Sequence, residues 1–242
     1  MITLEIENKK YQCPNNYSDI TLGRFKQIQT WLELEHNQPI VDKIIKSEVD
    51  DEEEALNFYL DFINYVTKIP KKYLMQVKPY GDDKIDELSI QWVFETLSFL
   101  LCVPQIENPK PVERIDNLYF IDKIDLNQAI LKDLTFREYV EANGVIKAFN
   151  ELKEGRYEYL NLLLAVMYRP KETKGKLWWK KEVIEEYDSE KVKRRAEWFD
   201  SVNMDIVWNT LFFFTQSKTN SLKNIEAYFQ EEMAKAQQDL KV

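Results

Sequence analysis

The spacing of apolar side chains predicts a mainly helical chain. Apolar residues recur at steps of three and four, which is the period of one face of an α-helix. Clear stripes of this kind cover residues 22–32, 55–66, 85–100, 192–202 and 206–214. Residues 157–167 are apolar nearly all round, so we expect a buried central helix there that Pro170 ends.

Two short β elements accompany these helices. Apolar and polar residues alternate from Ile2 to Ile6 and a polar run follows, which is typical of a hairpin over residues 2–13. A second β element is predicted near residues 116–122. The expected fold class is therefore mainly α with small β-hairpins (α+β), in which helical bundle-like modules are entered by short hairpins.

Helix-capping residues occur at several of the predicted helix starts. Thr21 and Thr135 each precede an apolar residue that has an aromatic residue three positions later. This similarity between residues 19–25 and 133–139 fits a duplication, a capping pattern that both helix starts share, or chance. Ser189 is expected to cap a further helix.

A cluster of prolines divides the chain. Pro104, Pro109 and Pro111 fall within eight residues, in a composition that neither a helix nor a strand accommodates. We therefore predict a linker over residues 104–113. It would separate an N-terminal hairpin and helical module, residues 1–103, from a C-terminal helical module, residues 114–242.

Composition limits the chemistry. The chain has 242 residues, with 5 glycines, 2 cysteines and one histidine, His36. A glycine-lined phosphate site, a histidine-centred hydrolase site and the usual zinc sites are therefore not expected. We predict no catalytic residues, no cofactor and no metal. An enzyme would have to use carboxylates, lysines or tyrosines instead.

Charge and hydropathy argue against two classes of partner. The 33 basic and 42 acidic residues give a net charge of -9, which opposes a global electrostatic attraction to nucleic acid or anionic lipid. The longest purely apolar run, residues 162–167, is far shorter than the roughly 20 residues of a membrane span. No membrane partner and no secretion are expected.

One basic segment, residues 168–181, departs from this acidic background. It has six basic residues against the single acid Glu172, with two tryptophans among them. The candidate partner-binding residues are Arg169, Lys171, Lys174, Lys176, Trp178, Trp179, Lys180 and Lys181. Such a loop suits docking on an acidic patch of a neighbouring subunit, with tryptophan as the anchor. There are two alternatives: the segment binds nucleic acid, or its tryptophans pack on the protein itself.

Three short patterns resemble structural proteins of the tail module of tailed bacteriophages, the crAss-like phages in particular. They are the hairpin at Leu4–Glu5–Ile6 leading to Asp19–Ile20–Thr21–Leu22, the break at Ile69–Pro70 with Tyr73–Leu74 after it, and Leu163 to Pro170 followed by Tyr187, Arg195 and Phe199. The resemblance implies a virion component that is present in the host cytoplasm during assembly. It equally accommodates a tail assembly chaperone that leaves the particle.

The functional expectation follows from these points together. We expect a non-enzymatic virion structural protein of the portal-tail region that contacts other phage structural proteins and forms a symmetric homo-oligomer. A tail assembly chaperone is the first alternative. A carboxylate- or lysine-based enzyme, or a cargo protein that contacts nucleic acid, is the second.

Overall fold

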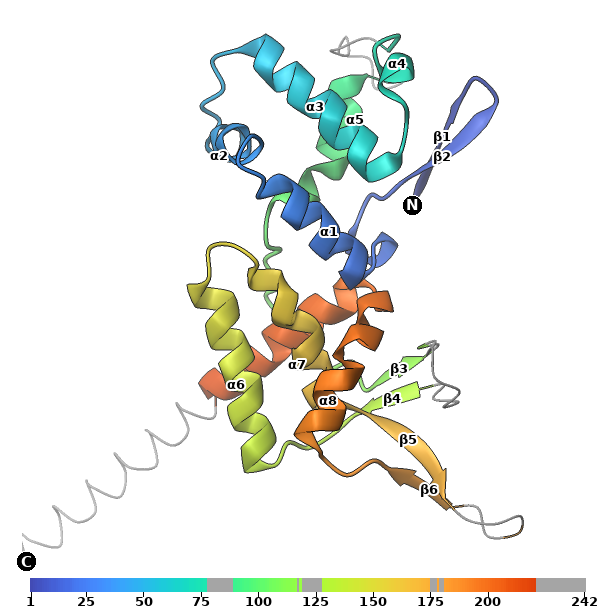
Figure 1. Cartoon of the computed structure of the whole chain (residues 1–242), viewed down its shortest axis with the longest axis vertical. Coiled ribbons are helices and arrows are strands. Elements are labelled where there is room, and N and C mark those ends of the chain that lie inside the picture. Colours follow the sequence, from blue (N-terminus) through green and yellow to red (C-terminus); the bar gives the residue numbers. More distant parts are fainter. Residues whose placement is uncertain (78–88, 117, 119–127, 175–177, 179–180, 221–242) are drawn as a thin grey trace, which may run out of the picture.

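The computed structural model describes residues 1–77, 89–116, 118, 128–174, 178 and 181–220. Within them the fold is mainly helical with two small antiparallel sheets, which confirms the predicted class. The molecule is elongated, with the N-terminal hairpin and helices at one end and the four-stranded sheet at the other (Figure 1).

The first half of the chain is a hairpin followed by helices, as predicted. Its elements are β1 (Ile2–Ile6), β2 (Lys9–Cys13), the 3₁₀ turn η1 (Tyr17–Asp19), α1 (Leu22–Leu32), α2 (Gln38–Lys46), α3 (Glu52–Thr67), α4 (Lys71–Leu74), α5 (Ile90–Leu97) and η2 (Ser98–Leu101). Glu7 and Asn8 join the two strands with positive φ angles of 48° and 62°. Two left-handed residues in succession give the turn the twist that antiparallel strands need.

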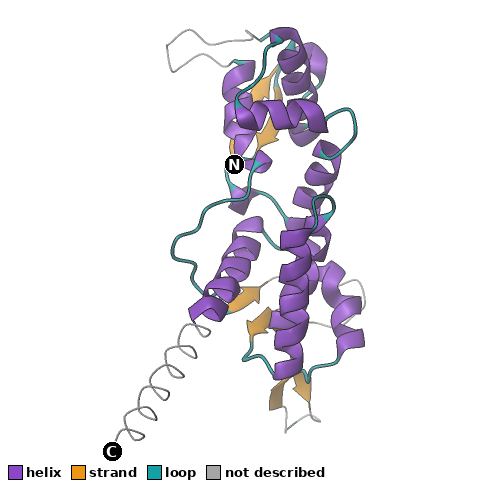
Figure 2. Cartoon of the chain, turned by 90° about the vertical axis from the view of Figure 1, so that its left-hand side faces the viewer, coloured by secondary structure: helices purple, strands orange, loops and turns teal. Residues whose placement is uncertain are grey.

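The second half combines a sheet with helices that pack beside it (Figure 2). Its elements are β3 (Arg114–Asp116), β4 (Gln128–Leu131), α6 (Phe136–Glu151), η3 (Arg156–Tyr159), α7 (Leu160–Met167), β5 (Tyr168–Lys174), β6 (Lys181–Ile184), α8 (Ser189–Arg195), η4 (Ala196–Ser201) and a helix over residues 204–220. The strand order is β3-β4-β5-β6, and every neighbouring pair is antiparallel.

The predicted central helix is confirmed. In α7 the side chains of Leu160, Leu163 and Leu164 are fully buried. The chain changes from helix to strand at Tyr168, two residues before Pro170, which disfavours the helical conformation of Arg169 and so keeps the helix from continuing. The helix therefore leads directly into β5.

Several predicted boundaries are confirmed or corrected by the hydrogen bonds at helix starts. Thr21 caps α1 by accepting from the Arg24 amide at 3.3 Å, and Thr135 caps α6. Asp188, and not Ser189, caps α8, because its carboxylate accepts from two backbone amides at 2.9 and 3.3 Å. Most of the β element predicted near residues 116–122, and the start of the stripe at 85–100, lie outside the described residues.

One hydrophobic core runs through both halves of the chain. Fully buried Trp208 lies at its centre, with ring centroids 5.9 Å from both Tyr17 and Phe25 and 6.1 Å from Phe149. The backbone adds two contacts, from the Leu22 amide to the carbonyl of residue 202 at 2.7 Å and from residue 204 to residue 20 at 2.9 Å. Residues 104–113 form no helix or strand, as a linker would, yet the parts that they connect share this core. The division into two modules stays a prediction.

Replacing Trp208 with alanine should destabilise both halves together. Removing a buried tryptophan typically costs about 3–5 kcal/mol, because a cavity remains where the ring was packed. Urea unfolding followed by circular dichroism measures the loss, and a single cooperative transition is expected at a lower midpoint. The matched control is Trp92→Ala, since Trp92 is 38% exposed on α5. An equal loss in the two variants would contradict the central role of Trp208.

Candidate functional site: the β5–β6 hairpin

The basic segment forms a β-hairpin, which corrects the prediction of a loop over residues 168–181. Strand β5 pairs with β6 from Lys171 opposite Ile184 to Lys174 opposite Lys181. Its other edge pairs with β4, where Tyr168 lies opposite Leu131. The first three residues of β5 pair with β4 and the last four with β6, so a polar and lysine-rich segment that has little strand propensity of its own is held extended by pairing.

The described part of the hairpin tip is exposed. Trp178 is 89% exposed and Lys181 is also exposed. Lys176, Trp179 and Lys180 lie outside the described residues, and only the backbone of Lys174 is described, at the end of β5. In Figure 1 the hairpin extends away from the helices at the sheet end of the molecule. A tryptophan that packs so little of its surface on its own chain is typical of an interface anchor.

Arg169 differs from the other basic residues of the segment. Its side chain is buried and forms an ion pair with Glu138, which is completely buried on α6. One of its nitrogens, Nη1, also donates to the carbonyl oxygen of Glu185 at 3.2 Å. Burial lowers the pKa of the guanidinium. Arg169 therefore holds the hairpin to the body and is not part of the exposed basic surface. Lys171, the next basic residue, is half-buried.

Glu138 has two partners because of its place on α6. It is the third residue of the helix, and its Oε2 accepts from the Thr135 amide at 2.6 Å, completing a capping box. Its Oε1 faces Arg169. One carboxylate thus caps α6 and neutralises a charge of β5. The threonine and glutamate spacing was the available sequence signal for this residue.

A second set of charges anchors the other strand of the hairpin. Glu185, directly after β6, forms a buried ion pair with Arg195 of α8 and lies 3.4 Å from Lys191. Tyr187 donates to a carboxylate oxygen of Glu141, and the guanidinium of Arg169 lies 5.5 Å from the centre of the Tyr187 ring. Burial, followed by the bond to Glu141, raises the pKa of Tyr187.

The base and the tip of the hairpin therefore differ in kind. At the base, each buried charge has an opposite charge beside it, and removing one member leaves the other desolvated and unpaired. At the tip, the described side chains face solvent. The arrangement presents an aromatic and basic tip on a base that is fixed to α6 and α8, which suits binding to a macromolecular surface.

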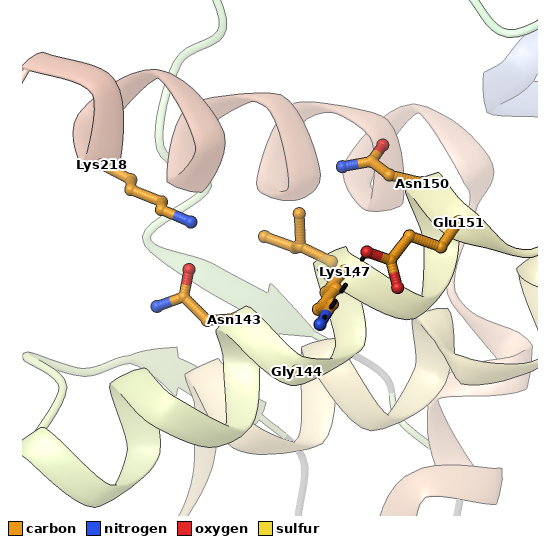
Figure 3. Close-up of a pocket in the computed structure, with 7 residues that line it drawn as sticks. Asn143, Gly144, Lys147, Asn150, Glu151 and Lys218 are labelled. Atoms are coloured by element: carbon orange, nitrogen blue, oxygen red, sulfur yellow. Dashed lines mark ion pairs between the residues drawn. The ribbon is translucent and has the colours of Figure 1, made fainter.

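Two grooves lie beside the helix over residues 204–220. One has a volume of about 400 Å³ and is lined by α6 residues Asn143, Gly144, Ile146, Lys147, Asn150 and Glu151 together with Lys218 (Figure 3). Lys147 and Glu151 form an ion pair across one helical turn, at 3.9 Å. The other groove, of about 630 Å³, lies between β4 and the same helix. In the described residues, no group of His, Cys, Asp and Glu could hold a metal ion.

Comparison of the chain with protein-family models, with curated proteins and with solved structures gives no match. In the part of the chain that the structure describes, no helix combines the length and apolar character needed to cross a membrane.

Replacing Arg169 with methionine should destabilise the fold far more than removing an exposed charge. Glu138 would stay buried without its counter-charge, and breaking a buried pair in this way costs about 3–5 kcal/mol. Lys193→Met is the matched control, because Lys193 pairs with Glu190 on the exposed face of α8 and such a pair contributes at most about 1 kcal/mol. Chemical unfolding at pH 7 measures both. A small effect of Arg169→Met would contradict the anchoring role.

Proposed function

We propose that the chain is a non-enzymatic structural protein of a tailed bacteriophage. It acts in the portal-tail region through contacts with neighbouring proteins. The observation that carries the proposal is Trp178, which is 89% exposed at the tip of a hairpin whose base is fixed by buried ion pairs. The assignment to a phage rests on the sequence resemblance at residues 4–22, 69–74 and 163–199.

The chemistry of the tip favours a protein partner with an acidic surface. Trp178 provides a large apolar area, and Lys181, three positions later, provides positive charge. Tryptophan with surrounding basic residues is common where protein interfaces have their strongest contacts. The net charge of -9 opposes binding of nucleic acid over a broad surface. It does not oppose a local contact at the basic tip. The partner therefore presents carboxylates around a recess that accepts an indole ring.

A fixed base makes the β5–β6 hairpin effective in binding. Binding by a segment that is already ordered avoids the entropy cost of ordering it during association. At the base of the hairpin, the buried pairs between Arg169 and Glu138 and between Arg195 and Glu185 supply that order. A small protein that makes one such contact per copy can build a large connector when the contact is repeated by symmetry.

Trp178→Ala should remove the protein from phage particles without unfolding it. Loss of an anchor costs about 2 kcal/mol or more, which weakens binding about 30-fold. The measurement is the copy number of the chain per purified particle, obtained by mass spectrometry of particles from a phage encoding the variant. Tyr159→Ala serves as the control, since Tyr159 is 45% exposed on η3, away from the hairpin.

Imaging of intact wild-type particles tests the structural assignment itself. Density for this chain in several symmetry-related copies at the portal-tail region is the expected result. Its presence in infected cells together with its absence from purified particles would overturn the proposal in favour of an assembly chaperone. Particles that keep Trp178→Ala at the wild-type copy number would exclude the hairpin tip as the contact.

A further inference from the structure

Helix α6 exposes two large apolar side chains on one face. Phe136 is 84% exposed and Val140 is 52% exposed. Gly144 and Lys147 continue the same face at steps of four and three residues. The opposite face of the helix is buried in the core through Ala142, Val145, Ile146 and Phe149. A large phenylalanine side chain almost wholly in water is costly unless another surface covers it.

This face is open to a partner along its length. In Figure 1 helix α6 lies at the edge of the molecule, and Figure 2 looks onto that side, where the helix runs along the front. A Cβ atom added at Gly144 would meet no atom within 4 Å. The groove of about 400 Å³ lies beside the glycine, with Lys147 and Glu151 along it (Figure 3). A second helix can therefore approach the α6 backbone most closely at Gly144.

We propose that this face binds α6 of a second copy of the chain, with the two helices antiparallel about a two-fold axis at Gly144. A two-fold interface is self-complementary, so each residue faces the one equally far on the other side of the axis. Val140 then faces Ala148 of the partner subunit, and Phe136 lies at the edge of the same contact. Each copy covers Val140 of the other and borders its Phe136.

The charges along α6 select this orientation. Arg137 is seven residues before Gly144 and Glu151 is seven after it, and their side chains are 68% and 64% exposed. An antiparallel pair centred on Gly144 brings Arg137 beside Glu151 of the partner subunit, twice in each dimer. A parallel pair would bring like charges together instead. Antiparallel helices also align their dipoles favourably.

The inference does not depend on the proposed function of the hairpin. In Figure 1 the hairpin and α6 lie on opposite sides of the lower half of the molecule, so an α6 dimer leaves Trp178 accessible. Failure of one interface therefore has a different signature from failure of the other. Particle incorporation reports on the hairpin, and the mass of the purified protein in solution reports on α6.

A charge exchange between Arg137 and Glu151 tests the geometry. Arg137→Glu alone and Glu151→Lys alone should each weaken dimerisation about tenfold, because each places two like-charge pairs across the interface. The double variant should restore the wild-type dimer. Within one helix these positions are about 21 Å apart, well beyond the screening length of about 8 Å at physiological salt, so rescue reports a contact between chains. Sedimentation equilibrium of the purified full chain measures the dissociation constants.

A cysteine at the axis provides a second, independent readout. In a Cys102→Ser background, Gly144→Cys should form a disulfide-linked dimer under mild oxidation, since the two sulfurs meet at the two-fold axis. Cys13 is buried and stays in both proteins. Asn150→Cys is the control, because this position is exposed on the same helix but six residues from the axis.

The outcomes decide the proposal. A concentration-dependent dimer, rescue by the double charge exchange and selective cross-linking at position 144 support it. A wild-type chain that stays monomeric up to about 1 mM overturns it. The proposal is also overturned if the charge variants leave the dissociation constant of the dimer unchanged and cysteines at positions 144 and 150 cross-link equally. The copies would then associate through another surface.

Discussion

A guanidinium in the interior of a protein needs an opposite charge beside it, and the pairing of Arg169 with Glu138 meets this need at the point where β5 leaves the core. The same carboxylate caps α6 through the amide of Thr135. The start of α6 and the base of the hairpin are therefore fixed by one side chain. Both surfaces that we propose for binding, the hairpin tip and the exposed face of α6, take their positions from this pair.

The core around Trp208 sets the frame in which this pair lies. The ring is fully buried and packs edge-on against Tyr17 and Phe25 from the first half of the chain and Phe149 from the second. Edge-to-face packing adds specificity to the apolar burial. As a result α6 has a fixed buried face toward the core, and its opposite face, which begins at Phe136, is left to solvent or to a partner.

The parts of the fold that follow from local pattern could be predicted from the sequence, and those that depend on distant partners could not. The helix at residues 22–32 and its cap Thr21 are encoded within a dozen residues. Strand β5 is extended because its first three residues pair with β4, some forty residues earlier, and its lysine-bearing remainder pairs with β6, whereas its own composition carries no strand signal. Arg169 was counted with the exposed basic residues for the same reason, because its counter-charge Glu138 lies 31 positions away and meets it only in the folded chain.

The two proposed interfaces are of different symmetry classes, and this limits what either can build. A contact between identical α6 faces is closed once two copies have met, so it cannot extend further. A hairpin tip that fits a different surface leaves each copy with one donor and one acceptor site, which is the arrangement that forms rings. Because Trp178 and Phe136 belong to separate surfaces, a dimer made through α6 would carry two hairpin tips. If both proposals hold, such a unit would bind a neighbouring assembly with both tips, and the second contact would form at high effective concentration.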